Sequence, residues 1–363
     1  MTLEVMRHDL AFRRAQRLPR RTIQKIVLAT DTWDETNGLN TTLQYTLDIG
    51  TQHGYDFVVL HPGLFLRFPN PLYPQYRLAL PTPWQVRRYL QTAQPQAVHI
   101  ATEGPIGLAV RQACLRYGWH FTTSFHTRWD EHGKYLTGVP LALGWKWVRW
   151  FHARSSQVLV PTASITTLLR THGFTQPLVQ WPKGIDRQHF HPRPKKHHGI
   201  KRPILLYVGR ISREKNLPAY LDLAVEGTKY VVGDGPFLAK LKRRYHRDVE
   251  AGRMVFFGEQ RGRALAELYA EADVFVFPSK TDTFGNVILE ALASGVPVAA
   301  YPVPGPIDIL RGQHVGAMHD NLEIAVHQAL AYGQTEACLA LAQQYSWEAA
   351  TERFLRAIVP VSS

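Results

Sequence analysis

The chain has 363 residues, a length that accommodates two domains with sizeable cores. A hydrophobic content of 45% and an aromatic content of 11% exclude a disordered chain. The 42 lysines and arginines exceed the 29 aspartates and glutamates, and the net charge of +13 favours anionic partners: nucleic acid, an acidic membrane surface or phosphorylated substrates.

The cysteine content and the first residues bear on the cellular compartment. Only two cysteines occur, Cys114 and Cys338, so we expect neither a disulfide scaffold nor a cysteine metal site, and a reducing cytoplasm fits. The first 21 residues carry six arginines but no apolar run. They predict a basic N-terminal segment, residues 1–21, rather than a signal peptide or a spanning helix.

Residues 22–195 alternate between short apolar runs and longer helical patterns. The runs predict five buried parallel strands, at 26–30, 57–61, 97–101, 121–125 and 157–161. Helical patterns lie between them, for example at 41–54 and 104–118. This alternation predicts an α/β domain with a doubly wound sheet.

A basic segment without apolar periodicity follows at 193–203, and it is typical of a linker between domains. The alternation then restarts in residues 196–344, where further strands are predicted at 203–210, 229–235, 253–259, 273–279 and 297–303. The closing stretch, 345–363, predicts an amphipathic helix with Trp347, Phe354 and Ile358 on one face.

Ligands of such sheets bind beyond the carboxyl ends of the strands, so the residues that follow strands are the candidates for a binding site. Gly38 follows the first strand, where it either forms a simple turn or lets the loop approach a phosphate. Arg210 and Lys215 follow the first strand of the second domain, and they belong either to a solvated loop or to a phosphate site. His126 also follows a strand, as a structural residue or as a ligand contact.

The stretch TDTFGNVILEALASG, residues 281–295, combines two acids with a helix start. Asp282 and Glu290 lie eight positions apart, a little over two helical turns, and Gly285 precedes a buried helical pattern over 287–293. Glycine lets backbone amides approach a ligand, and a helix N-terminus offers unpaired N–H groups with a partial positive charge. The combination suits a phosphate placed between two acids.

Several other chemistries lack their motifs in this sequence. The G-x-G at 233–235 is followed by Pro236 and Phe237 without the rest of the dinucleotide fingerprint, so it predicts a strand-to-helix turn. The sequence contains no Walker motif, no H-E-x-x-H and no G-x-S-x-G. It also contains no Asp-x-Asp, the carboxylate pair that often holds Mg²⁺ or Mn²⁺ on a sugar diphosphate.

Together these motifs resemble those of family 4 glycosyltransferases, retaining enzymes of the GT-B fold. The resemblance runs from about residue 23 to the C-terminus and is carried by TDTWDETNG, HIATEGPIGLAVR, SFHTRWDEH, WPKGIDRQHF, YVGRISREKN, VVGDGP, FVFPSKTDTFGNVILEALASGVPVAA and YSWE. It implies two facing Rossmann-like domains with a cleft between them and a C-terminal helix that crosses back to the first domain. Bacterial α-mannosyltransferases and glycolipid-forming enzymes look most similar.

The resemblance also implies roles for the acidic stretch. Glu290 would hold the ribose hydroxyls of a nucleotide, and Asp282 would contact hydroxyls of the transferred sugar. In the family these acids form a Glu-x7-Glu motif, and here the first side chain is one methylene shorter. The backbone amides around Phe284, Gly285 and Asn286 would meet the diphosphate and the sugar.

The loops after the strands complete the implied site. Arg210 and Lys215 match the family's diphosphate-binding cations, Gly38 its N-domain glycine loop and His126 its sugar-contacting histidine. The acceptor hydroxyl would attack from the leaving-group face, without a covalent intermediate and with retention of configuration. The two acids would then act as binding groups, unlike the acid/base pair of glycoside hydrolases. Neither a metal nor another cofactor is expected.

The stretch GWKWVRWFHARSS, residues 144–156, interleaves aromatic and basic residues: Trp145, Trp147, Trp150 and Phe151 with Lys146, Arg149 and Arg154. On a helix, Trp147, Trp150 and Phe151 share one side, while Lys146 and Arg149 lie on another. The sequence allows two interpretations. The tryptophans pack on the first sheet as a core helix, or the helix lies at a membrane interface with its cations toward anionic lipid.

The sequence therefore predicts a retaining, metal-independent hexosyltransferase that uses GDP-mannose or UDP-glucose. Its expected acceptor is a lipid, such as diacylglycerol or a glycolipid precursor, on the inner face of the cytoplasmic membrane. A soluble sugar phosphate or a polysaccharide is the alternative acceptor, and a sugar-nucleotide epimerase of the same fold is a more distant alternative. Nucleic-acid binding is permitted by the charge, but no nucleic-acid motif supports it.

Overall fold

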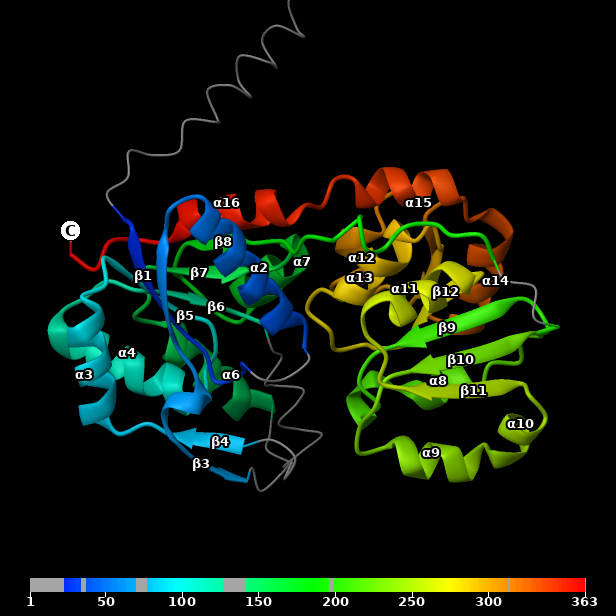
Figure 1. Ribbon diagram of the computed structural model, residues 1–363, viewed down its shortest axis with the longest axis horizontal. Helices are drawn as coiled ribbons and strands as arrows, with labels where there is room; N and C mark the ends of the chain where they lie inside the picture. Colours follow the sequence, from blue (N-terminus) through cyan, green and yellow to red (C-terminus); the bar gives the residue numbers. More distant parts are fainter. Residues whose placement is uncertain are drawn as a thin grey trace, which may run out of the picture.

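The protein forms two α/β domains that lie side by side, each built around a six-stranded sheet (Figure 1). The computed structural model describes residues 23–33, 37–69, 77–126, 141–195, 199–312 and 314–362. The basic N-terminal segment predicted at 1–21 lies outside the described residues.

The first sheet has the strand order β2-β1-β5-β6-β7-β8, and all of its pairings are parallel. Its strands are β1 (Lys25–Ala29), β2 (Asp56–Leu60), β5 (Ala97–Ile100), β6 (Thr122–Ser124), β7 (Gln157–Val160) and β8 (Leu178–Gln180). The five predicted strands are confirmed. The sequence analysis missed β8, because this three-residue edge strand has no fully buried side chain and hence no continuous apolar run.

The helices of this domain are α2 (Gly38–Gln52), α3 (Pro83–Ala93), α4 (Pro105–Tyr117), α6 (Leu141–His152) and α7 (Ala163–Thr171), with a 3-10 turn, η1 (Pro62–Leu64). An antiparallel ribbon of β3 (Leu66–Pro69) and β4 (Arg77–Leu80) stands between β2 and α3, and the sequence analysis did not predict it.

The inner strands of the first sheet, β1, β5, β6 and β7, are buried on both faces, which explains their unbroken apolar runs. Along β1, Val27 and Ala29 belong to the core formed with α3 and α4. Ile26 and Leu28 belong to the opposite core, which includes Phe354 near the C-terminus.

The second sheet has the order β11-β10-β9-β12-β13-β14. Its strands are β9 (Ile204–Val208), β10 (Thr228–Val232), β11 (Met254–Gly258), β12 (Val274–Phe277), β13 (Val298–Ala300) and β14 (Gly316–Met318), of which all but β14 were predicted. Around it lie η2 (Arg213–Lys215), α8 (Leu217–Leu221), α9 (Leu238–Arg244), α10 (His246–Glu250), α11 (Gly262–Glu271), α12 (Asn286–Ala293), α13 (Pro306–Ile309), α14 (Leu322–Tyr332) and α15 (Thr335–Ala342). The G-x-G at 233–235 lies in the turn between β10 and α9, as predicted.

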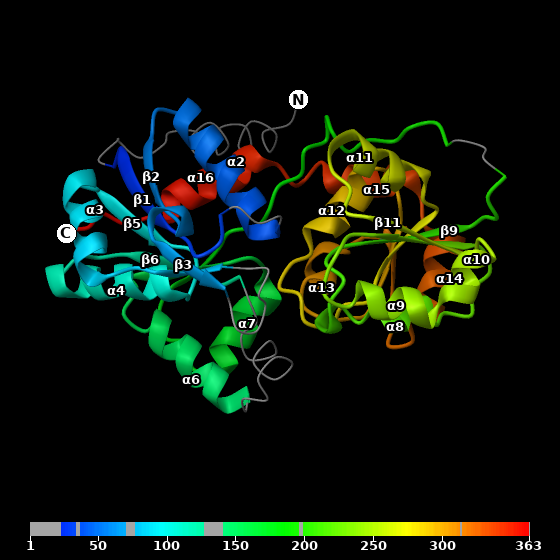
Figure 2. The same ribbon diagram turned by 60° about the horizontal axis from the view of Figure 1, so that its bottom comes forward.

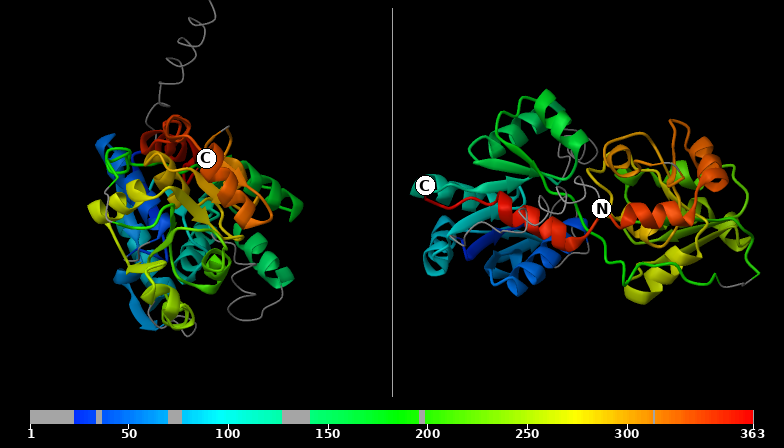
Figure 3. Two further views of the ribbon diagram at one scale, coloured as in Figure 1. Left: turned by 90° about the vertical axis from the view of Figure 1, so that its right-hand side faces the viewer. Right: turned by 90° about the horizontal axis from the view of Figure 1, so that it is seen from above.

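The chain crosses between the domains twice, and its last helix, α16 (Trp347–Ala357), covers the first sheet beside α2 (Figure 2). Trp347 stacks on Tyr45 of α2 with 4.6 Å between the ring centres. The two crossings meet at Gly184, where a Cβ would lie 2.4 Å from the backbone nitrogen of Trp347. The view from above shows α16 over the first domain and α15 over the second (Figure 3). The predicted return of the C-terminal helix is therefore confirmed.

Candidate functional site

Residues that follow strands of the two sheets meet across the domain boundary. The Asn286 side-chain amide donates to the Gly38 carbonyl at 3.2 Å, and the Thr283 hydroxyl donates to the His126 carbonyl at 2.9 Å. Gly38 opens α2 rather than forming an isolated turn, because Asn37 caps that helix by accepting from the Asn40 amide at 2.9 Å. The carboxyl ends of the two sheets therefore face each other, which is where ligands of such sheets bind.

The N-terminus of α12 lies at this boundary. Gly285 caps the helix with φ +89°, in the left-handed region that favours glycine, and no side chain caps it. Phe284 is buried and its ring packs in the core of the second domain, so it faces the boundary through its backbone only. The uncapped amides of α12 and the helix dipole together form a site suited to an anion.

A lysine and a carboxylate pair beside the start of α12. Lys215 Nζ lies 2.5 Å from Asp282 Oδ1, and both side chains are mostly buried. Arg210 stands five residues earlier on the same loop, where its carbonyl accepts from the Tyr207 hydroxyl at 2.8 Å. Burial and the nearby Asp282 carboxylate raise the pKa of Tyr207, which keeps this phenol a donor. The loop thus places the ammonium group of Lys215 beside Asp282, which lies three residues before Gly285.

Glu290 lies in α12 and accepts a hydrogen bond from the Tyr269 hydroxyl at 2.7 Å. Burial raises the pKa of Glu290 to about 7, and the bond from Tyr269 opposes that shift. A carboxylate in this state gains from additional hydroxyl donors, because each donor bond favours its ionised form.

Lys183, which follows β8, was not predicted as a site residue. Its Nζ lies 3.4 Å from His126 Nδ1 and 4.8 Å from the centre of the Trp181 ring. Burial lowers the pKa of Lys183 to about 7. Lys183 was overlooked because β8 was not predicted. If that edge strand had been predicted, Lys183 would have been one of the residues that follow the carboxyl end of a strand.

Asp31 was also missed, although it directly follows β1. Its carboxylate accepts from the Ile106 and Gly107 amides at 2.7 and 3.2 Å, and from the Thr102 hydroxyl at 2.7 Å. Asp31 thereby fills the N-terminus of α4, so the anion site at that helix is already occupied by the protein's own carboxylate.

Helix α6 combines a buried side with an exposed aromatic side, and it lies at the edge of the first domain (Figure 2). Trp147 and Trp150 are 39% and 47% exposed, so they are not core residues. Phe151 lies on the same side of the helix, as predicted, with 6.2 Å between its ring centre and that of Trp147, but Phe151 itself is fully buried. Trp145 stacks on His172 with 3.7 Å between the ring centres. Within the described residues, no helix is long and apolar enough to cross a membrane.

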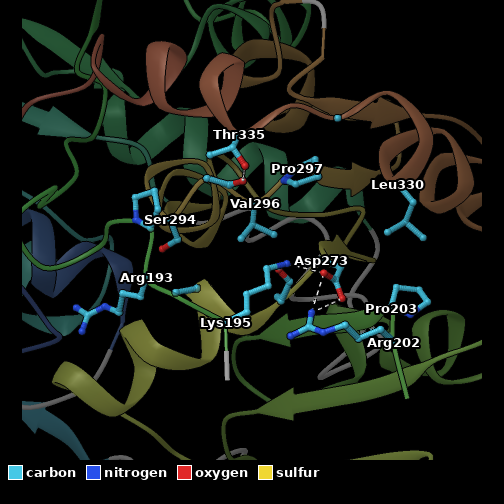
Figure 4. A pocket seen from close by; sticks show the side chains of 15 residues that line it. Arg193, Lys195, Arg202, Pro203, Asp273, Ser294, Val296, Pro297, Leu330 and Thr335 are labelled. Carbon is cyan, nitrogen blue, oxygen red and sulfur yellow. Dashed lines mark hydrogen bonds and ion pairs between the residues drawn. The ribbon is translucent and has the colours of Figure 1, made fainter. Parts of the chain in front are cut away.

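A cavity of about 620 Å³ lies at the amino ends of the strands of the second sheet (Figure 4). Its lining includes Arg202, Asp273 and Pro297, which precede β9, β12 and β13 at their amino ends. Lys195 and Arg202 both reach Asp273, at 2.5 and 2.7 Å, so this network anchors the linker to the sheet. The cavity therefore lies at the end of the sheet opposite to Asp282 and the start of α12.

Two families and several known proteins match this chain. Residues 12–189 match the family described as Glycosyltransferase Family 4, and residues 202–332 match Glycosyl transferases group 1. A GDP-mannose-dependent alpha-mannosyltransferase of Mycolicibacterium smegmatis is 32% identical over 276 residues, which cover 72% of this chain and 71% of that protein. An alpha-monoglucosyldiacylglycerol synthase of Streptococcus pneumoniae is 27% identical over 247 residues, 62% of this chain and 56% of that one.

The fold has close structural counterparts as well. Sucrose-phosphate synthase from Thermosynechococcus elongatus superposes with a TM-score of 0.75 at 18% identity, covering 91% of this chain and 97% of that one. A likeness at this level of identity concerns the fold alone, and it confirms the predicted GT-B arrangement of two facing α/β domains.

Proposed function

This chain belongs to glycosyltransferase family 4, and we propose that it transfers a hexose from a nucleotide diphosphate sugar to a lipid acceptor at an anionic membrane surface. The uncapped N-terminus of α12 supports binding of the nucleotide sugar donor. Lys215 and Asp282 lie beside this N-terminus, and Glu290 lies within the helix. Helix dipole, cation and carboxylates together match a nucleotide diphosphate sugar in charge and in hydrogen bonding.

Each group then has a role in the transfer. Cleavage of the sugar–phosphate bond builds negative charge on the departing diphosphate, and Arg210, Lys215 and the α12 amides stabilise it. Glu290 accepts from the ribose hydroxyls, and Asp282 binds hydroxyls of the sugar. Because Lys215 already pairs with Asp282, the diphosphate and the sugar hydroxyls replace a contact that the protein makes with itself.

The acceptor hydroxyl attacks the anomeric carbon from the face that the diphosphate leaves, and its proton passes to the departing phosphate oxygen. This path retains configuration and needs no protein nucleophile, which agrees with carboxylates that bind rather than attack. Similarity to a GDP-mannose-dependent enzyme supports GDP-mannose as the first donor to test, with UDP-glucose second.

Two exposed apolar patches on the first domain support a lipid acceptor. Leu66 and Leu80 pair across the β3–β4 ribbon, and they are 73% and 49% exposed. Trp84 is 60% exposed, and the guanidinium of Arg88 lies 5.4 Å from its ring centre. Aromatic and apolar side chains next to cations are the composition of surfaces that dock on anionic membranes.

The second patch lies on α6, where Trp147 and Trp150 share the exposed surface with Lys146 and Arg149. Each cation near an anionic surface contributes about 1 kcal/mol of attraction, so a handful suffices for reversible docking. The similarity to an alpha-monoglucosyldiacylglycerol synthase is consistent with diacylglycerol as acceptor.

Vesicle sedimentation coupled to transfer tests the proposal. The protein is mixed with vesicles of phosphatidylcholine and diacylglycerol, with or without phosphatidylglycerol, and with radiolabelled GDP-mannose or UDP-glucose. We expect labelled lipid and sedimentation only with the anionic vesicles, fading with salt and reduced in K146E/R149E. An enzyme that stays in the supernatant at low salt and glycosylates a soluble sugar would end the lipid proposal. Nucleotide sugar converted without any acceptor would point to an epimerase instead.

A further inference from the structure

Lys183 is a buried lysine with no acidic partner among the residues that the structure describes. Only 4% of the residue is exposed, and its Nζ contacts His126 Nδ1 at 3.4 Å and the Trp181 ring at 4.8 Å. Across the described ranges, no aspartate or glutamate forms an ion pair with it. A buried ammonium without an anion is costly, so local packing alone does not account for a lysine here.

A second buried lysine, Lys229, shows how this fold provides hydrogen-bond acceptors for a buried ammonium group. Its Nζ donates to the carbonyls of Leu221 and Leu223 at 2.7 and 2.6 Å. Lys183 has a histidine nitrogen and an aromatic face in place of those carbonyls. The two lysines therefore differ: Lys229 donates to two backbone carbonyls, whereas the hydrogen-bond contact of Lys183 within the described residues is one long contact to a ring nitrogen.

Two further imidazoles, those of His99 and His152, lie near the His126 ring. His99 in β5 uses both ring nitrogens, with the Thr122 and Ser124 hydroxyls at 2.9 and 3.1 Å. His152 in α6 likewise contacts the Thr123 hydroxyl at 2.8 Å and Glu103 at 3.1 Å. These nitrogens are therefore engaged elsewhere and supply no counter-charge.

His126 is the exception among these histidines. Its Nδ1 faces Lys183, while its Nε2 is buried without a hydrogen-bond partner. Burial, followed by the charge of Lys183, lowers the pKa of His126. A buried amine and a buried imidazole thus lie side by side, and the Nε2 atom of the imidazole has no hydrogen-bond partner in the described part of the chain.

This pair lies next to the proposed donor site but not at its diphosphate. The Thr283 hydroxyl bonds the His126 carbonyl, and Thr283 follows Asp282, the residue assigned to the transferred sugar. The diphosphate has its own cations and the N-terminus of α12 on the second domain. Lys183 belongs to the first domain, which receives the acceptor.

We propose that Lys183 and His126 form a subsite for an acidic group, a carboxylate, phosphate or sulfonate, carried by the transferred sugar or by the acceptor. The inference rests on the proposed function and narrows its substrate class. The acid accepts hydrogen bonds from Lys183 Nζ and from the protonated Nε2 of His126. Its negative charge offsets the burial of the ammonium, so the lysine is charged in the complex.

Calorimetry with matched probes distinguishes the two sources of the acid. In the sugar arm, UDP-glucose is compared with UDP-glucuronate, which differs only by a carboxylate at C6. In the acceptor arm, glycerol is compared with glycerol 3-phosphate, each in the presence of saturating UDP or GDP. Each comparison uses the wild type, K183M and K229M, where K229M removes a buried lysine that lies outside the site.

We expect the acidic probe of one arm to bind the wild type and K229M about tenfold or more tightly than its neutral partner, and this preference to vanish in K183M. UDP and GDP alone should bind all three proteins equally. The arm that shows the preference identifies whether the sugar or the acceptor carries the acid. No preference in either arm, or a preference that survives in K183M, overturns the inference while leaving the transferase assignment intact.

Proton linkage provides a second measurement that needs no variant to fold. Because burial lowers the pKa of Lys183 to about 7, its amine is mostly neutral at pH 8. An acid bound beside it raises that pKa, so binding takes up as much as about one proton at pH 8, measurable from the buffer dependence of the binding enthalpy. Binding of the preferred acidic probe without proton uptake contradicts the subsite. Failure of every nucleotide to bind overturns the proposed function, and this inference with it.

Discussion

Replacing Glu290 by glutamine should stabilise the free protein and lower its affinity for the nucleotide. Burial raises the pKa of Glu290 from 4.5 to about 7, so folding favours the protonated carboxyl. The stability contributed by this raised pKa is complete below pH 4.5 and is lost as the pH rises through 7. A shift of this size corresponds to about 3 kcal/mol at pH 8, taking roughly 1.4 kcal/mol per pKa unit.

Glutamine reproduces the neutral carboxyl at all pH values and can still accept from the Tyr269 hydroxyl. Glu290→Gln should therefore gain up to about 3 kcal/mol over the wild type at pH 8 and almost nothing at pH 4.5. Nucleotide binding should change in the opposite direction. Loss of a charged acceptor for two ribose hydroxyls costs about 2–3 kcal/mol, or roughly a hundredfold in the dissociation constant of GDP or UDP.

The assay is chemical denaturation from pH 4.5 to 8.5, followed by calorimetric titration with GDP and UDP. Glu259→Gln serves as control, because that carboxylate is exposed and pairs with Arg261 at the surface. A stability difference between Glu290→Gln and the wild type that is the same at pH 5 and pH 8 would refute the burial argument. Unchanged nucleotide affinity would remove Glu290 from the donor site.

Three further outcomes are expected. Lys215→Ala and Arg210→Ala should each lower kcat by roughly 10²-fold or more with a smaller rise in KM, because leaving-group charge peaks in the transition state; steady-state kinetics that show a KM effect alone would make them ground-state binders. Transfer should persist in EDTA, because in the proposed function Arg210, Lys215 and the N-terminus of α12 stabilise the diphosphate without a metal; activity lost in EDTA and restored by Mg²⁺ would contradict this. Gly285→Ala should destabilise the fold by about 1–2 kcal/mol and weaken UDP binding, because its φ of +89° strains any side chain; equal denaturation midpoints would refute that reasoning.

The sequence by itself determined the parts of the fold that are buried on both faces. Strands such as β1 and β9 are continuous apolar runs because helices cover both sides of a parallel sheet, and such runs are readable without coordinates. The start of α12 was equally readable, since Gly285 interrupts the chain directly before a buried helical pattern. The edge strand β8 and the β3–β4 ribbon were not predicted, because their side chains are partly exposed and their pairing depends on neighbouring strands.

Only the tertiary structure decided which of the predicted loops meet and what surrounds each side chain. Gly38 and Asn286 are 248 residues apart and touch because the two domains face each other. In the sequence, Lys183 is one of many cations in a basic chain. Only the structure shows that it is buried against His126 and Trp181. A local sequence pattern indicates which residues are buried. It does not indicate which residues they contact, because those contacts depend on how distant strands and whole domains pack together.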